Sequence, residues 1–169
     1  MKSRRLNADC KLFEIMKYYN YDIVFQEIPD ETTLAINISN CPCRCPGCHS
    51  TFLWKDQGTE LTVNEYERLL NTVVEDITCV CFMGGDANPK YINALADFTF
   101  QNYPFLKIGW YTGRETISSE INLDLFDYVK VGRYNKELGG LTSKTTNQRM
   151  YKIIHKPFQL KDITFKFTK

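Results

Sequence analysis

Four cysteines stand within eight consecutive residues, at positions 41, 43, 45 and 48. Pro42, Pro46 and Gly47 lie between them, and these residue types interrupt helices and strands. Residues 40–50 are therefore expected to form an irregular loop, the cysteine loop. Four thiols at this density are typical of a metal or cluster site, whereas a disulfide framework belongs to oxidising compartments. The odd total of 7 Cys also argues against a complete set of disulfides.

Three of these cysteines, Cys41, Cys45 and Cys48, follow the spacing C-x3-C-x2-C. Three thiolates on one tight loop can hold three corners of a cubane iron–sulfur cluster and leave the fourth iron open to a ligand. The common ferredoxin spacings are not present in this sequence. Cys43 is left over, either as a fourth ligand that closes the site or as a side chain that points away from the metal.

Two other kinds of site use pairs of cysteines. A zinc knuckle formed by Cys45 and Cys48 needs a second pair, and Cys79 and Cys81 have only one residue between them. A thioredoxin-like redox pair at the same two loop positions leaves Cys41 and Cys43 without a role. Both fit less well than an iron–sulfur cluster.

The length of 169 residues fits one domain, and 43% hydrophobic with 24% charged residues is ordinary for a globular protein. Because Lys and Arg number 21 against 20 Asp and Glu, charge favours neither nucleic acid nor an anionic membrane. No apolar run approaches the roughly 20 residues of a membrane span, and the N-terminus lacks the apolar stretch of a signal peptide. We expect a cytoplasmic protein whose residues 1–16, including Cys10, form an N-terminal extension without an assigned function.

Strands and helices alternate along the chain. Thr62 and Glu65 form a capping box before an apolar face of helical spacing, and Asn88-Pro89 opens a second helix. A short helix is also expected from residue 114. Strands are predicted at residues 22–28, 33–38, 77–83, 107–112 and 128–131, with an edge strand or tail at 163–167. This order predicts an α/β fold with a mainly parallel sheet.

Ligands of parallel α/β sheets bind beyond the carboxyl ends of the strands. Three predicted strands end at conspicuous residues: the cysteine loop, the Gly84-Gly85-Asp86 turn and Gly113. We therefore expect these segments to meet at one edge of the sheet. Cys79 and Cys81 lie two apart on a predicted strand, so both point to one face and are expected to be core residues.

Taken together, these motifs resemble the radical S-adenosylmethionine (SAM) enzymes. Within them, the sequence is similar to the activating proteins of anaerobic ribonucleoside-triphosphate reductases, over roughly residues 18–154. The motifs that carry the resemblance are the C-P-G-C-H run of residues 45–49, Trp54, the Gly-Gly-Asp turn, the Tyr-Thr-Gly run of residues 111–113, and Asn147-Gln148-Arg149. The resemblance implies one radical SAM domain over residues 17–169, folded as a partial (β/α) barrel.

For function, the resemblance implies a 4Fe-4S cluster held by Cys41, Cys45 and Cys48, with SAM on the fourth iron. Gly84 and Gly85 would let the backbone approach the methionyl part of SAM, and Asp86 would accept from its ammonium group. The remaining residues implied at the cofactor are Gly47, Cys48, His49 and Thr112.

The implied activity is reductive cleavage of SAM to generate a glycyl radical on the anaerobic reductase. The partners would be that reductase and a low-potential electron donor such as flavodoxin or ferredoxin, with neither nucleic acid nor membrane. Two alternatives stay open: an activase of another glycyl-radical enzyme, and a closed iron–sulfur or zinc module without SAM chemistry.

Overall fold

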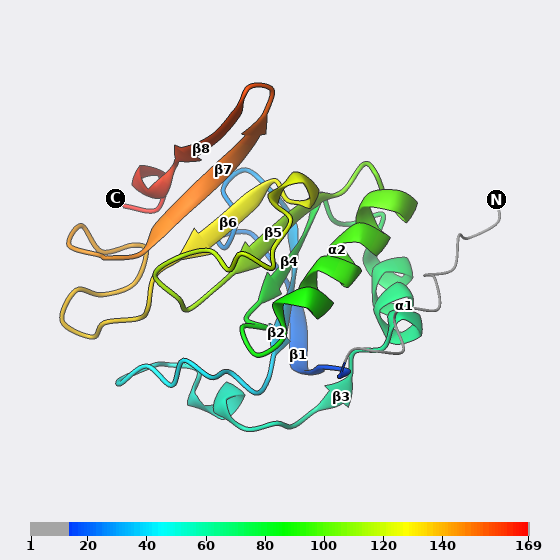
Figure 1. Ribbon diagram of the computed structural model, residues 1–169, viewed down its shortest axis with the longest axis horizontal. Helices are drawn as coiled ribbons and strands as arrows, with labels where there is room; N and C mark the ends of the chain where they lie inside the picture. The colour runs from blue at the N-terminus through cyan, green and yellow to red at the C-terminus, as the bar shows by residue number, and fades with distance from the viewer. Residues whose placement is uncertain (1–13, 169) are drawn as a thin grey trace.

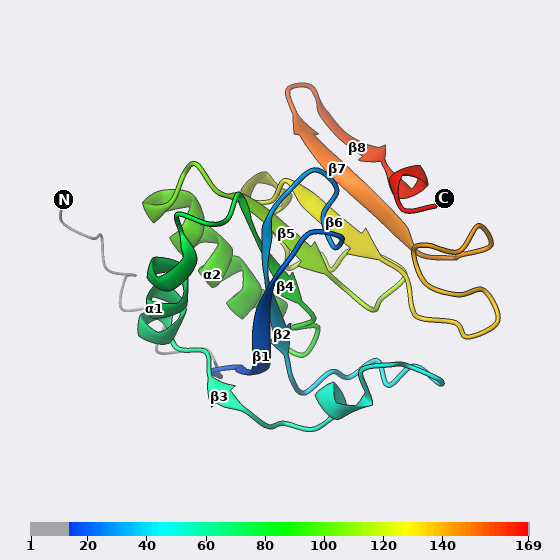
Figure 2. The ribbon, with the colours of Figure 1, turned by 180° about the vertical axis from the view of Figure 1, so that it is seen from behind.

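The computed structural model describes residues 14–168, which form a single sheet of eight strands with helices on one face (Figures 1 and 2). The strand order is β3-β1-β2-β4-β5-β6-β7-β8. The strands are β1 (Lys17–Val24), β2 (Thr33–Ile38), β3 (Thr59–Glu60), β4 (Cys79–Met83), β5 (Lys107–Tyr111), β6 (Tyr128–Val131), β7 (Arg149–His155) and β8 (Phe158–Asp162). The helices are α1 (Val63–Val73) and α2 (Pro89–Asn102), with short 3-10 helices at η2 (Thr51–Trp54), η3 (Leu123–Leu125) and η4 (Thr164–Lys166).

The four central strands, β2, β4, β5 and β6, are parallel. Antiparallel strands flank them on both sides: β1 pairs with β2 and β3 with β1 at one edge, and β7 pairs with β6 and β8 with β7 at the other. The predicted α/β class is confirmed as one mixed sheet, in which only the centre is parallel. The partial barrel stays a prediction. None of the described helices is long and apolar enough to cross a bilayer.

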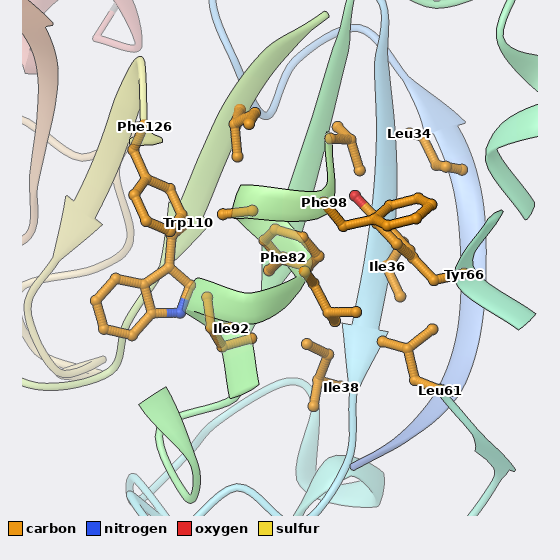
Figure 3. Packing of buried hydrophobic residues seen from close by; sticks show 14 of the residues in the cluster. Leu34, Ile36, Ile38, Leu61, Tyr66, Phe82, Ile92, Phe98, Trp110 and Phe126 are labelled. Carbon is orange, nitrogen blue, oxygen red and sulfur yellow. The ribbon is translucent and has the colours of Figure 1, made fainter. Parts of the chain in front are cut away.

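The main core lies between the helices and the sheet (Figure 3). The ring of Tyr66 from α1 lies 5.7 Å from that of Phe82 in β4 and 6.0 Å from that of Phe98 in α2. Trp110 of β5 is fully buried in the same cluster, and its indole N–H donates to Gly84 O at 2.8 Å. This core fixes where β4 and β5 end.

Both predicted helix starts are confirmed. The Thr62 hydroxyl accepts from the Glu65 amide at 3.1 Å, and the Asn88 side chain accepts from the Tyr91 amide at 3.2 Å. The Glu65 carboxylate also accepts from the Tyr18 hydroxyl at 2.6 Å, which ties α1 to β1. These side-chain caps satisfy amides that a helix leaves unpaired at its first turn.

The first predicted strand, at residues 22–28, is misplaced because β1 spans Lys17–Val24. The apolar residue Ile28 is fully buried, but it packs on the sheet face opposite the helices, where its Cδ1 would lie 3.1 Å from a Cβ at Gly109. Its hydrophobicity therefore reflects packing beneath the sheet rather than strand pairing.

One further prediction is wrong, and one of two alternatives at the C-terminus is excluded. The helix expected from residue 114 is absent from the described connection between β5 and β6, which contains turns and the 3-10 helix η3. In this connection, polar side chains bind the backbone locally. The Ser118 hydroxyl accepts from the Glu120 amide at 3.2 Å, and the Asn122 side chain accepts from the Asp124 amide at 3.1 Å. Of the edge strand or tail expected at residues 163–167, the strand is not formed: the segment is a tail that contains η4, and Asp162 accepts from the Thr164 amide at 2.8 Å. The edge strand on this side of the sheet is β8.

Candidate functional site

The carboxyl ends of the parallel strands bring the predicted segments together. The Gly84 amide donates to Tyr111 O at 3.0 Å, which joins the end of β4 to that of β5. The Thr112 amide donates to Lys130 O at 2.9 Å, which joins β5 to β6. The cysteine loop follows β2 at the same edge. The predicted convergence of these segments is confirmed.

The cysteine loop is fixed at its base by backbone hydrogen bonds. The Asn40 amide donates to Lys55 O at 3.0 Å, and the Cys41 amide donates to Leu53 O at 2.9 Å. Within the loop, Arg44 has a φ of 42° and Gly47 a φ of 74°, so the chain reverses direction in the left-handed region. These bonds and turns hold all four loop cysteines within one short segment.

All four loop cysteines are free thiols, of which Cys45 is buried and the other three are half-buried. The Ser50 amide donates to the Cys48 sulfur at 3.4 Å, and such N–H···S bonds are also made to thiolate ligands of iron–sulfur clusters. Among residues 14–168, no three His, Cys, Asp or Glu side chains converge as ligands of a single metal ion. The donor set, thiols on one loop, fits an iron–sulfur cluster in chemistry and spacing.

Asp86 is the most connected polar side chain at this edge. It is 3% exposed, and its carboxylate accepts from the Thr112 hydroxyl, from the Gly113 amide at 2.9 Å and from the Cys43 thiol at 3.7 Å. The Arg114 Nε lies 3.9 Å from the Asp86 Oδ1. One carboxylate thus joins the ends of β4 and β5 to the cysteine loop.

The two glycines before Asp86 are required by the backbone. Gly84 and Gly85 have φ values of 107° and 92°, in the region that favours glycine. At Gly85, a Cβ would also lie 2.5 Å from the Cδ1 of Ile92 in α2. These glycines therefore allow the close turn beside α2 that leads into the buried Asp86.

Sequence reasoning missed Lys130, a buried cation in β6. Its Nζ donates to Gly132 O at 2.8 Å. Burial lowers the pKa of Lys130 to about 8, although the nearby acidic groups of Cys45, Asp86 and Cys43 act to raise it. A lysine inside the otherwise apolar run Tyr128–Val131 is the signal that could have identified it. Lys130 places a positive group under the cysteine loop.

The segment after β6 covers one side of the cysteine loop. The Arg133 Nη2 donates to Cys43 O at 2.8 Å, and the Tyr134 ring lies 5.4 Å from the exposed ring of His49. Gly47 faces the Lys136 side chain, since a Cβ there would lie 3.2 Å from the Lys136 Cβ. The predicted residues Gly47 and His49 therefore lie on the outer part of the loop, whereas Thr112 is fully buried beside Asp86.

The remaining cysteines lie away from this edge or outside the described residues. Cys79 and Cys81 are fully buried in the cluster on the sheet face opposite the helices, as predicted, and burial raises the pKa of both thiols. Cys10 falls among residues 1–13, which lie outside the described part of the chain.

The comparisons with known proteins identify one family. A family described as a 4Fe-4S single cluster domain matches residues 32–154, from just before β2 to within β7. No curated protein and no solved structure matches the chain. The matched residues include the whole cysteine loop and the strand ends beside it, and they make up well over half of the sequence. The chain therefore belongs to the 4Fe-4S single cluster domain family.

Proposed function

We propose that this iron–sulfur protein is a radical SAM activase that generates a glycyl radical on anaerobic ribonucleoside-triphosphate reductase. The observation that carries the proposal is the position of the C-x3-C-x2-C loop, which lies beside the buried Asp86 at the carboxyl edge of parallel strands. Three thiolates leave one iron without a protein ligand, and Asp86 lies beside the loop that supplies them. The partial (β/α) barrel and the cytoplasmic location belong to the same proposal.

Cys41, Cys45 and Cys48 would hold the cluster. When bound, it would supply the electron that cleaves the S–C5′ bond of SAM, giving methionine and a 5′-deoxyadenosyl radical that takes a hydrogen atom from a glycine α-carbon. The cleavage consumes one electron, which an external low-potential donor such as flavodoxin or ferredoxin would provide. The protein's own contribution is to bind and orient SAM.

Asp86 would accept from the ammonium group of SAM. A carboxylate has about four acceptor positions, and Thr112, Gly113 and Cys43 occupy three of them. One position is left for a charge-assisted bond, which gains strength from the burial of this carboxylate. Gly84 and Gly85 would allow the methionyl group to approach the backbone beside Asp86.

Three further residues would complete the cofactor site. Gly47 and His49 flank Cys48 and would lie along the adenine, where the exposed His49 ring contacts only the Tyr134 ring among the aromatic contacts of the described residues. Thr112 would act indirectly, because its hydroxyl already donates to Asp86. Lys130 would place positive charge below an anionic cluster and so stabilise its reduced form.

The test is anaerobic reconstitution with iron and sulfide, followed by electron paramagnetic resonance of the dithionite-reduced protein with and without SAM. We expect a four-iron signal that changes when SAM is added, together with release of 5′-deoxyadenosine. Incubation with the reductase should then yield a glycyl radical signal. A cluster that is indifferent to SAM would contradict the proposal and favour a closed iron–sulfur module.

Asp86→Ala gives a sharper version of this test. The variant should keep near-normal iron content but bind SAM more weakly, because it removes the acceptor and leaves the proposed ligands Cys41, Cys45 and Cys48 in place. Lys90→Ala is a matched control, since Lys90 pairs with Glu120 on the exposed side of α2. Unchanged SAM affinity in the Asp86 variant would remove this residue from the site.

A further inference from the structure

Cys43 is the one loop thiol that a three-thiolate site does not use, yet three separate elements contact it. Its sulfur lies 3.7 Å from the Asp86 Oδ2, beyond the end of β4. Its carbonyl accepts from Arg133, which follows β6. Its side chain packs against Gly113, which follows β5. These contacts fix the direction of Cys43 toward the strand ends.

Gly113 leaves only enough room for the Cys43 thiol. A Cβ at position 113 would lie 2.8 Å from the Cys43 sulfur and 3.1 Å from its Cβ. Backbone strain does not explain this glycine, because its φ lies outside the left-handed region. Glycine at this position therefore accommodates the thiol itself.

The contact between Cys43 and Asp86 has a clear direction. An ionised carboxylate can only accept hydrogen bonds, so in the 3.7 Å contact the Cys43 S–H is the donor and the Asp86 Oδ2 the acceptor. Asp86 is buried and also accepts from the Gly113 amide at 2.9 Å, so the acceptor is held in place by the strand end that packs against the thiol.

We propose that Cys43 is a positioning residue whose S–H donates to Asp86 and attaches the cysteine loop to the ends of β4 and β5. This assignment rests on the proposed use of Cys41, Cys45 and Cys48 as the cluster ligands. The contact keeps the loop next to the carboxylate that is proposed to bind SAM. Loss of the contact should free the loop while leaving three ligands in place.

The first measurement uses the protein without a cluster. Hydrogen exchange of the peptide covering residues 41–48 should become several-fold faster in Cys43→Ala and return toward the native rate in Cys43→Ser, whose hydroxyl can donate to Asp86. The thermal unfolding midpoint, recorded for each variant, verifies that the sheet is intact. Exchange that is unchanged in Cys43→Ala would overturn the proposal.

A double-mutant cycle isolates the contact. Gly113→Ala introduces a methyl group that displaces the thiol, so it should reproduce the faster exchange of Cys43→Ala. In the Cys43→Ala background the same change should add less, because the 2.8 Å approach to the sulfur has been removed and only the 3.1 Å approach to the Cβ remains. Additive effects of the two substitutions would show that they act at independent places and would also overturn the proposal.

The second measurement uses the reconstituted protein. Cys43→Ala should bind as much iron and sulfide as the native chain and should bind SAM several-fold more weakly, with partial recovery in Cys43→Ser. Loss of iron in Cys43→Ala would identify Cys43 as a ligand and overturn the assignment. If neither native protein nor variants respond to SAM while exchange responds as expected, the SAM proposal fails and the Cys43–Asp86 contact stands.

Discussion

The six cysteines among the described residues form two groups whose surroundings are opposite in character. Cys79 and Cys81 lie in a central strand, fully buried, where burial raises the pKa of both thiols. The loop cysteines lie beyond the strand ends, and three of the four are only half-buried. A thiol enclosed by apolar side chains acts as a small hydrophobic residue, whereas one in a polar, accessible loop can lose its proton and bind metal. Position in the fold thus separates the structural cysteines from the candidate ligands.

The largest expected difference between the groups is in iron binding. Cys45→Ala or Cys48→Ala should lose essentially all of the cluster after anaerobic reconstitution, because each removes a proposed ligand. The double variant Cys79→Ala/Cys81→Ala should retain it. Iron and sulfide analysis of the purified proteins measures both. If the Cys79→Ala/Cys81→Ala variant lost iron while keeping its fold, the division into structural cysteines and candidate ligands would be wrong.

Thiol accessibility should differ almost as strongly. In the cluster-free protein, iodoacetamide should modify the half-buried loop cysteines Cys41 and Cys48 at ordinary rates. Cys79 and Cys81 should react slower by a factor on the order of 10³ or more, because a central strand opens only with near-global unfolding. Mass spectrometry of labelled peptides over time gives the rates. Comparable rates for the two groups would show that β4 is far less protected than its burial indicates.

Substitutions at Cys81 should show that this thiol packs as a hydrophobic residue. Cys81→Ala should cost about 1 to 2 kcal/mol of unfolding free energy through lost packing. Cys81→Ser should cost about 1 to 3 kcal/mol more, because it buries a hydroxyl among apolar side chains. Urea unfolding of each variant provides the values. A serine variant as stable as the alanine variant would mean that the hydroxyl finds a partner.

The smallest expected effect comes from a charge remote from both cysteine groups. Hydrogen bonds from Arg68 and Tyr18 lower the pKa of Glu65 to about 2 from 4.5. Since the pKa is lower in the folded state, Glu65 stabilises the protein above pH 4.5, and this contribution disappears as the pH falls toward 2. Glu65→Gln should therefore cost up to about 1 kcal/mol at pH 7 and little at pH 2.5. Iron content should not change, which sets this residue apart from the loop.

The part of this arrangement that the sequence predicts depends on local signals. A few adjacent residues are enough to predict the cysteine spacing, the caps at Thr62 and Asn88, and the strand that ends at Gly84. The helix expected from residue 114 is wrong because polar side chains in that segment bind their own backbone. Residues 163–167 alternate like a strand, but the strand position is already taken by β8.

Contacts between distant segments are the part that the sequence does not reveal. Lys130 appears as one polar residue in an apolar strand, and nothing local indicates that its ammonium reaches the carbonyl of Gly132 below the loop. The partners of Cys43 come from three later strand ends. The candidate ligands could therefore be read from spacing, whereas the side chains that position them required the fold.

The wide separation of Cys43 from its partners also concerns how the protein is made. Cys43 precedes Asp86 by 43 residues, and Gly113 and Arg133 follow later still. At about 5 to 20 residues per second, translation leaves an interval of roughly 2 to 9 seconds between Cys43 and Asp86. During that interval the nascent chain carries four thiols without the strand ends that later surround them. The thiols of the loop therefore gain the neighbours that position them only after the ends of β4, β5 and β6 have been synthesised.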